Sequence, residues 1–178
     1  SAAPSPAESM PPDASIADLP PQDIEAERAI LRACISDSEA VRRAGAILTS
    51  ASFYRLAHAT IFAGMQRVAK SGESLDAITL RNELTRVGRL NEVTDTLAEI
   101  VGSQMSAANV EAHARIVRSA FVRRQILGVS QRLRESAFDQ AEDLDATIRR
   151  DVDALLALLG VGRGFALVTA QELMFEWG

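Results

Sequence analysis

Hydrophobic residues recur every three or four positions along most of this chain, a spacing that predicts amphipathic helices. Polar runs and glycines interrupt the pattern and divide the first hundred residues into five predicted helices. They cover about 23–35, the stretch after Ser38 that includes Val41, Ala44 and Leu48, about 56–69, the stretch between a capping Asp76 and Gly88, and a short segment with Leu97, Ile100 and Val101.

A longer helix is predicted from about Asn109 to Phe138. Thirty residues at 1.5 Å each make a rod of about 45 Å, which is longer than a compact core needs, so part of it should project. A further helix, capped by Asp143, carries a hydrophobic stripe in which the residues repeat at helical spacing. The stripe consists of Leu144, Ile148, Val152, Leu155 and Leu159. The two helices should form an antiparallel hairpin whose faces need a partner to cover them.

The two ends of the chain differ from the middle. All six prolines precede residue 22, and residues 1–18 hold few large hydrophobic groups, which predicts a disordered tail. Residues 160–164 form a glycine-rich joint, and Thr169 starts a capping box for a last helix that contains Phe175 and Trp177. That helix is expected to be either a severed linker or a peptide that docks on another surface.

The 178 residues are enough for one domain, which we place at residues 19–159, with a head at 19–106 and the hairpin at 107–159. Without proline after residue 21, and rich in Ala, Leu, Arg and Glu, it is expected to be all-α. No run of 18 hydrophobic residues and no secretory signal is visible. The single cysteine, Cys34, is expected to be a reduced core residue, which favours a cytoplasmic location.

Charge is distributed unevenly along the predicted hairpin. The net charge is −5, which argues against a dedicated nucleic-acid-binding domain. Between Glu111 and Glu135, however, six Arg and two Glu give +4, whereas between Asp139 and Asp153 six acids and two Arg give −4. Opposite charges in neighbouring segments predict pairing within the hairpin, or an interface that uses both. The arginines are Arg115, Arg118, Arg123, Arg124, Arg132 and Arg134.

Candidate chemistry is sparse. Residues 64–71 approximate a phosphate-binding loop, but Ala69 stands where that loop needs glycine and the segment is predicted to be helical. His58 and His113 have no cysteines or carboxylates at metal-ligand spacing, and His58 is expected to be packed against a backbone carbonyl or a carboxylate. The sequence predicts no catalytic residue, no cofactor site and no metal site in this chain.

Four carboxylates are candidates for paired acids: Glu25, Glu27, Asp76 and Glu83. Glu25 and Asp76 have a simpler role at helix starts, where a negative charge is favourable. Glu27 and Glu83 are expected on solvated faces.

A series of short motifs resembles the amino-terminal domain of replicative DNA helicases of the DnaB type. The first helix contains Asp-Ile-Glu-Ala-Glu at 23–27, and Phe53-Tyr54 precedes a His-x-x-Ile-Phe segment at 58–62. The resemblance continues with Asp-x-x-Thr-Leu at 76–80 and later with Ala-x-Ile-Val at 114–117. A Gly-Gly pair of the family is replaced by Val-Thr-Asp at 93–95, which leaves the start of the fifth helix open. The resemblance assigns structural roles to Glu25, Glu27, His58, Phe62, Asp76 and Thr79.

The resemblance implies a non-catalytic assembly domain. In the family the hairpins pair, and three dimers form a collar that receives primase, on a motor that uses ATP and Mg²⁺. Residues 160–178 would then begin the linker to that motor. DNA contact would be indirect or weak, and no membrane is involved. The candidate self-association residues are Val110, Val117, Phe121, Arg123, Arg124, Ile148, Val152, Leu155 and Leu159.

Two other functions are compatible with the sequence. The chain could be a freestanding helical adaptor that serves another partner, or a DNA-binding protein that uses its arginine-rich face. The negative net charge and the lack of aromatic residues among the arginines weigh against DNA binding.

Overall fold

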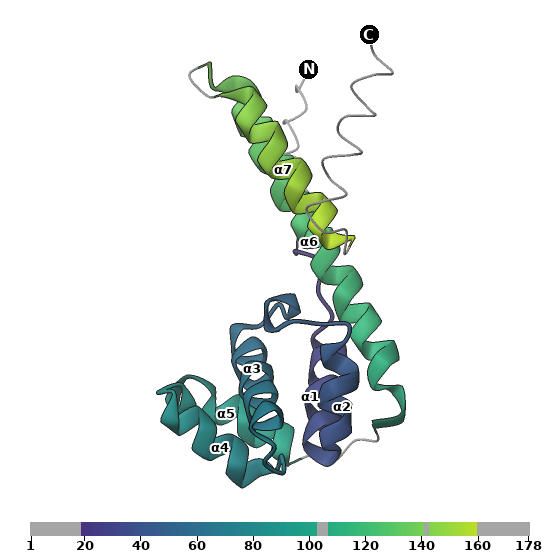
Figure 1. Cartoon of the computed structure of the whole chain (residues 1–178), viewed down its shortest axis with the longest axis vertical. Coiled ribbons are helices and arrows are strands. Elements are labelled where there is room, and N and C mark those ends of the chain that lie inside the picture. The colour runs from purple at the N-terminus through teal and green to yellow at the C-terminus, as the bar shows by residue number, and fades with distance from the viewer. Residues whose placement is uncertain (1–18, 103–106, 141–142, 160–178) are drawn as a thin grey trace, which may run out of the picture.

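The protein consists of a helical head from which a two-helix rod projects (Figure 1). The computed structural model describes residues 19–102, 107–140 and 143–159. Within these ranges every regular element is helical, as the hydrophobic pattern predicts. The predictions for residues 1–18 and 160–178, including the glycine joint and the last helix, lie outside the described residues.

Five α-helices build the head, and their order follows the prediction. Four begin within one residue of the position expected from the sequence. The fifth, whose start the sequence leaves open, is longer than the short segment expected, because it begins at Leu90, directly after the turn at Gly88. The helices are α1 (Ile24–Ser36), α2 (Ser38–Gly45), α3 (Leu56–Ser71), α4 (Ala77–Arg86) and α5 (Leu90–Val101), with a short 3-10 helix, η2 (Ser50–Ser52), between α2 and α3.

Local side-chain signals set the helix ends. The carboxylate of Asp23 accepts a hydrogen bond from the Ala26 amide at 2.8 Å, and Asp76 accepts from the Thr79 amide at 2.8 Å. This last bond, from the backbone of Thr79, lowers the pKa of Asp76 below its ordinary value. Gly72 follows α3 with φ of 79°, a left-handed conformation that favours glycine.

The core of the head lies between α1 and α3, with α2, α4 and α5 packed around them. Ile30, Leu31, Phe62 and Met65 are fully buried there, and the Phe53 and Phe62 rings lie 4.9 Å apart. Each such side chain contributes about 1.5–3 kcal/mol of burial free energy. Cys34 belongs to the same cluster, and burial raises the pKa of its thiol to about 12, so it is a packed and unreactive residue.

Helix α3 approaches α4 closely at Gly64, inside the segment that approximates a phosphate loop. A Cβ atom at Gly64 would lie 3.0 Å from Leu80 Cδ1 and 3.2 Å from Leu84 Cδ2. The glycine is therefore explained by helix packing, and its place in the middle of α3 removes the geometry that a phosphate loop requires.

The rod consists of α6 (Val110–Phe138), which follows a 3-10 helix, η3 (Ala107–Asn109), and α7 (Leu144–Leu158). The first part of α6 packs on α1 and α2 of the head, and its far part pairs with α7 (Figure 1). The hairpin is thus present as predicted, and Asp143 caps α7 by accepting from the Ala146 amide at 3.1 Å. Among the described helices, none has the length and hydrophobicity needed to cross a membrane.

Candidate assembly surface and its joint with the head

The inside of the hairpin is built largely from polar side chains. In the part of α6 that pairs with α7, the buried residues are Val129 and Ser136, and the buried residues of α7 are Thr147 and Asp151. Two packed helices normally bury their hydrophobic residues against each other. In the described part of the rod this arrangement is largely absent, so the hairpin has little hydrophobic core of its own.

An ion pair joins the two helices inside the hairpin. Asp151 Oδ1 accepts hydrogen bonds from Arg132 Nε at 3.1 Å and from Arg132 Nη2 at 3.0 Å, and Arg150 Nε lies 3.6 Å away. Burial of this carboxyl opposes its ionisation, but the hydrogen bond and charge of Arg132, aided by Arg150, lower its pKa below the ordinary value. The predicted pairing of basic and acidic segments is therefore present at this point.

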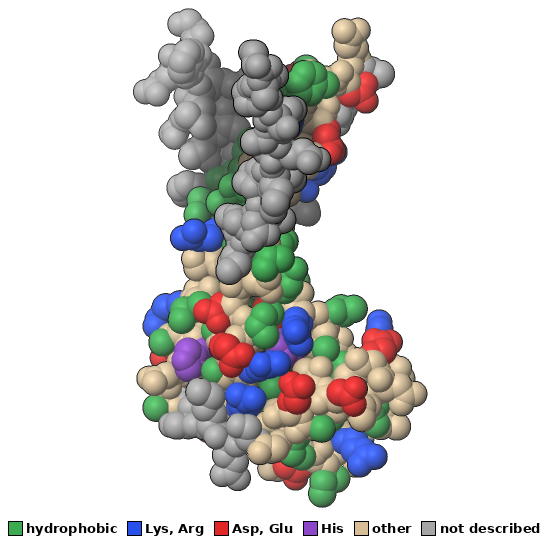
Figure 2. Space-filling view, turned by 180° about the vertical axis from the view of Figure 1, so that it is seen from behind, with side chains coloured by type: hydrophobic (Ala, Val, Ile, Leu, Met, Phe, Trp, Pro, Cys, Tyr) green, Lys and Arg blue, Asp and Glu red, His purple; other side chains and the backbone are tan. Residues whose placement is uncertain are grey.

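Large hydrophobic side chains lie on the outside of the rod instead. Their exposed fractions range from 38% at Leu133 to 81% at Phe138. Figure 2 shows hydrophobic side chains at the surface of the rod above the head. The exposed residues are Ile116, Ile126, Leu127, Leu133 and Phe138 of α6, Leu144, Ile148 and Val152 of α7, and Leu159 just after it.

Several of these hydrophobic residues, among them Ile126 and Ile148, share one side of the hairpin. On α6, Ser136 is buried toward α7. Ile126 points about a quarter turn away from that direction, clockwise when the helix is viewed from its amino end. On α7, Ile148 is rotated by a similar angle in the same sense from Thr147 and Asp151. Because the helices are antiparallel and face each other, equal rotations bring both sets of residues to the same side.

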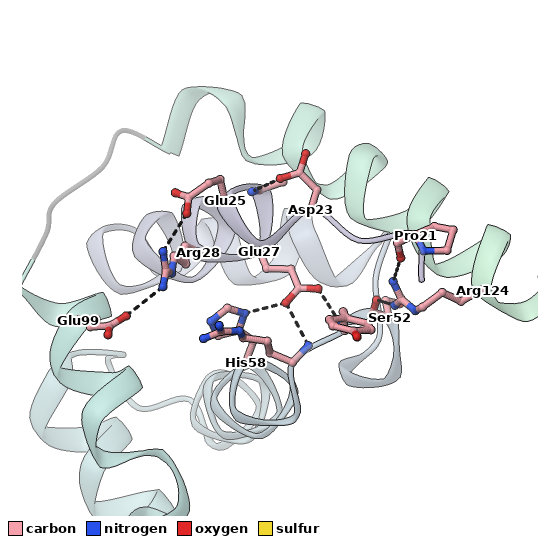
Figure 3. A network of polar contacts seen from close by, with 12 residues as sticks. Pro21, Asp23, Glu25, Glu27, Arg28, Ser52, His58, Glu99 and Arg124 are labelled. Atoms are coloured by element: carbon pink, nitrogen blue, oxygen red, sulfur yellow. Dashed lines mark hydrogen bonds and ion pairs between the residues drawn. The ribbon is translucent and has the colours of Figure 1, made fainter. Parts of the chain in front are cut away.

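Arg124 attaches the hairpin to the head. Its guanidinium donates hydrogen bonds to the carbonyl oxygens of Pro21 and Ser52, both at 2.7 Å (Figure 3). It also lies 5.5 Å from the centre of the Tyr54 ring and 5.9 Å from that of Phe121. Burial lowers the pKa of Arg124 below its ordinary value, with the charge of Glu27 acting in the opposite direction. The side chain thus links α6 to the segments before α1 and α3.

A second arginine ties the end of α7 to the same region. Arg118 donates a hydrogen bond at 2.6 Å to the carbonyl oxygen of Leu158, one of the last in α7. Its guanidinium lies 5.6 Å from the centre of the Phe121 ring, and the guanidinium of Arg124 lies 5.9 Å from the same centre. We call Arg118, Phe121 and Arg124 the joint, since they connect α7, α6 and the head.

Below the joint, a buried carboxylate holds the start of α3. Glu27 accepts hydrogen bonds from the Tyr54 amide at 2.5 Å and from His58 Nδ1 at 2.7 Å, and the Arg55 amide lies 3.4 Å away (Figure 3). Glu27 is 1% exposed and His58 is fully buried. Since the carboxylate accepts, Nδ1 of His58 carries the proton, and its Nε2 is buried without a hydrogen-bond partner in the described structure.

This arrangement explains why His58 is buried, and two expectations about the exposure of carboxylates are wrong. His58 is packed against a carboxylate, as predicted. Glu27 is not on a solvated face, because it supplies the acceptor that the first amides of α3 need. Glu83 is also largely covered, because Arg67 and Arg86 bond to its two oxygens, and these hydrogen bonds, chiefly that of Arg86, lower its pKa. Within the described residues no cluster of His, Cys, Asp or Glu could hold a metal ion.

The candidate self-association residues fall into three groups. The prediction is wrong for Val110 and Val117, because both are buried in the core of the head and cannot reach a partner. Phe121 and Arg124 belong to the joint. The others lie on the rod, where Leu155 is half-buried and the rest are exposed: Arg123, Ile148, Val152, Leu155 and Leu159.

Several exposed hydrophobic residues were missed as candidates. Ile126, Leu127 and Leu133 lie in the far half of α6, where the prediction named none. The spacing of Ile126 and Leu133, one heptad apart, was the available signal.

Comparisons with known proteins place the sequence of this chain in a family. The family model "DnaB-like helicase N terminal domain" matches residues 19–119. The chain is 36% identical over 132 residues to "Replicative DNA helicase DnaB" of Geobacillus stearothermophilus, covering 73% of this chain and 29% of that protein. It is 34% identical over 131 residues to "Replicative DNA helicase DnaC" of Bacillus subtilis, covering 71% and 29%. The chain therefore spans less than a third of the length of these relatives.

A solved structure shows the same fold. The crystal structure of the N-terminal domain of DnaB helicase from Mycobacterium tuberculosis superposes with a TM-score of 0.70 at 24% identity, covering 78% of this chain and 99% of that one. At this identity the likeness is evidence for the fold alone, whereas the family model matches more than half of the chain. This chain belongs to the family of DnaB-like helicase N-terminal domains.

Proposed function

We propose that this chain is the assembly domain of a replicative DNA helicase and that it associates with a second copy of itself through the hairpin. The observation that carries the proposal is the reversed polarity of the hairpin. Buried positions between its helices are mostly polar, whereas Ile126, Ile148 and Val152 are exposed on one side. A hydrophobic side of this kind is stabilised when another surface covers it.

Further steps of the proposal rest on the family. The unwinding of duplex DNA, with ATP and Mg²⁺, is assigned to a motor outside this chain, in a hexamer made of three dimers in the cytoplasm. Primase is the proposed docking partner of the assembled domains. Titration of the purified protein with primase from the same organism tests that step, and the absence of a binding signal would contradict it.

The two other candidate functions have less support. A freestanding adaptor would use the same hydrophobic side for a different protein, so it predicts a chain that stays monomeric alone. DNA binding would need free arginines, yet Arg118, Arg124 and Arg132 bond to groups of this chain. Those bonds reduce the positive surface that phosphates could contact.

Sedimentation analysis of Ile148→Arg tests the proposed self-association. Ile148 is 51% exposed on the hydrophobic side, and a charge there would be buried without a partner in the dimer. We expect the dissociation constant of the dimer to rise by at least about a hundredfold. The far-ultraviolet circular dichroism should remain that of a helical protein.

Ala146→Arg is the matched control. Ala146 is exposed two residues away, on the opposite side of α7, and the same charge there should leave the dimer intact. Unaltered protein that stays monomeric at millimolar concentration would contradict the proposal. Equal weakening by both substitutions would show that the hydrophobic side is not the contact.

A further inference from the structure

The carboxyl end of α7 is completed by a side chain from another helix. The last carbonyl groups of an α-helix have no hydrogen-bond partner within that helix. Leu158 is the final residue of α7, and its carbonyl oxygen accepts a hydrogen bond from Arg118 of α6 at 2.6 Å. A positive charge at this end of a helix is also favourable for the helix dipole. Arg118 therefore fixes the place where the chain leaves the hairpin.

Arg118 also contacts the aromatic ring that Arg124 contacts. Phe121 lies three residues after the first arginine and three before the second, so both are its neighbours on the surface of α6. The two guanidinium groups lie 5.6 and 5.9 Å from the centre of this ring. The face of an aromatic ring attracts cations at such distances. A shift of either guanidinium therefore changes the ring position that is most favourable for the other.

Arg124 carries the series of contacts into the head. Its two hydrogen bonds end on Pro21 and Ser52, in the segments before α1 and α3 (Figure 3). Its guanidinium also lies 5.5 Å from the centre of the Tyr54 ring, and the Tyr54 amide donates to the buried Glu27. Contacts between neighbouring groups therefore lead without a gap from the last turn of α7 to a buried group of the head.

We propose that the joint is a conformational switch, in which the position of the Leu158 carbonyl sets how firmly α6 is held to the head. With this carbonyl on Arg118, the Phe121 ring contacts both arginines, and Arg124 is oriented toward its acceptors in the head. When the carbonyl moves away, Arg118 turns to water and the ring loses one of its two cations. The orientation of Arg124 then becomes less restricted.

The switch would let the head respond to the course that the chain takes after α7. The response passes through α6, along a continuous set of side-chain contacts that has two arrangements. It takes place within one chain, so it does not depend on the proposed self-association.

A simple tie between α6 and α7 is the alternative role of Arg118, and it has a different consequence. Arg132 is such a tie further along the rod, where it bonds to Asp151 of α7 without belonging to the joint. Loss of a tie should loosen α7 alone. If the joint is a switch, loss of Arg118 should loosen both α7 and α6 relative to the head.

Distances between spin labels in the full chain distinguish the two roles. One label replaces Glu73 in the head, and the second replaces Gln131 on α6 or Ala154 on α7, all of which are exposed. In Arg118→Met, we expect the population outside the main peak to rise at least about twofold for both label pairs. The measurements are made at a protein concentration at which sedimentation shows a monomer. The native thiol of Cys34 is buried and takes no label.

Arg132→Met is the matched control. It also removes a bond from an arginine of α6 to α7, but at a distance from the Phe121 ring. The population outside the main peak should rise for the label pair that includes Ala154 and stay unchanged for the pair that includes Gln131. Arg118→Lys, which keeps a cation that can donate to Leu158, should behave like the unaltered protein for both pairs.

Phe121→Leu tests whether the ring carries the coupling. Leucine keeps a hydrophobic side chain but removes the aromatic face that both arginines contact. In the Phe121→Leu protein, Arg118→Met should cause less than about half of the rise that it causes with the ring present, since the two substitutions break the same connection.

Three outcomes would overturn the switch. One is a distribution between Glu73 and Gln131 that Arg118→Met leaves unchanged, since Arg118 would then be a tie between two helices. Another is an equal change of that distribution in Arg132→Met, because any loosening of the hairpin would then reach the head. The third is full addition of the effects of Arg118→Met and Phe121→Leu, which would show that the ring connects nothing.

Discussion

At the scale of single residues, three charged side chains of this protein bond to the backbone of distant segments. Glu27 accepts from the Tyr54 amide, whereas Arg124 and Arg118 donate to carbonyl oxygens of Pro21 and Leu158. Amides before a helix and carbonyls at its end have no partner within the helix itself. These side chains therefore stabilise places where segments that are distant in sequence begin, end or meet.

Replacement of Glu27 by alanine should destabilise the head strongly. The Tyr54 amide and the buried His58 would lose their acceptor, and water cannot easily replace it at a site that is 1% exposed. We expect the free energy of unfolding to fall by about 2–4 kcal/mol. Urea denaturation followed by circular dichroism measures the change.

Glu25→Ala provides the comparison on the same helix. The Glu25 side chain is 76% exposed, and its partner among the described residues is Arg28, so its loss should change the free energy of unfolding by less than about 1 kcal/mol. Similar losses for the two substitutions would mean that the Glu27 contacts do not stabilise the head.

At the scale of elements, the direction of α6 relative to the head depends on the joint. Arg124 bonds to carbonyl groups that lie 103 and 72 residues earlier in the chain. Without these bonds, the packing of α6 on α1 and α2 would still hold the helix to the head. Its far half would be held less firmly, because the residues of α6 that belong to the hydrophobic cluster of the head, Val110, Ala114 and Val117, all lie in its first half.

Arg124→Met should widen the range of angles between the rod and the head. Methionine keeps much of the volume of the side chain but cannot donate to Pro21 and Ser52. Spin labels at Glu73 in the head and Gln140 near the tip, both exposed, allow the distance distribution to be measured. We expect a broader distribution and a loss of about 1–3 kcal/mol in the free energy of unfolding.

Arg123→Met is the matched control for the joint. Arg123 is the exposed neighbour of Arg124, and no hydrogen bond within the chain depends on it in the described contacts. Its distance distribution should match that of the unaltered protein under conditions where the protein is monomeric. If both variants gave the same narrow distribution, Arg124 would not set the angle.

The sequence predicts elements of this fold better than it predicts contacts between them. Asp76, Asp143, Gly72 and Gly88 act within a few residues of their own positions, so their signals are local and the helix ends follow from them. The fifth helix was predicted as a short segment around Leu97, Ile100 and Val101, and the family motif that is missing there left its start open.

Long-range contacts left no comparable signal in the sequence. The bond between Glu27 and His58 joins residues 31 positions apart. The family motif marks Glu27 as structural, but the hydrophobic pattern around it does not reveal its partner. Val110 and Val117 were assigned to a partner because periodicity identifies a hydrophobic face without showing what covers it. The head covers the first part of that face, and the exposed part begins further along α6.

At the scale of the whole molecule, the head and the rod differ in how they are stabilised. The head has a continuous hydrophobic cluster that reaches Val117 on α6. The rod beyond it is held by Val129, polar contacts such as Arg132–Asp151, and the backbone of two helices. A pair of helices with so little buried hydrophobic surface is only marginally stable by itself.

Hydrogen exchange should reveal this difference in a monomeric variant. In Ile148→Arg, we expect amides of α7 and of the far half of α6 to exchange at least about tenfold faster than in the dimer, because association no longer stabilises the rod. Amides of α1 and α3, which lie in the core of the head, should keep their protection. Mass spectrometry of peptic fragments resolves the two regions.

Ala146→Arg again serves as the reference, since it should retain both the dimer and slow exchange in the rod. Uniform acceleration across head and rod would instead indicate that the substitution destabilises the entire fold. Unchanged exchange in a monomeric rod would show that the hairpin is stable without a partner.

The bond from Arg118 to Leu158 also has a mechanical consequence. The rod extends away from the head and returns, so its second helix finishes beside its own root instead of at the far tip (Figure 1). A pull on the polypeptide just past Leu158 would therefore reach Phe121 and Arg124 over a few side chains, with almost no lever arm. Force applied there would act on the contacts at the base of the hairpin and would hardly reach its outer end.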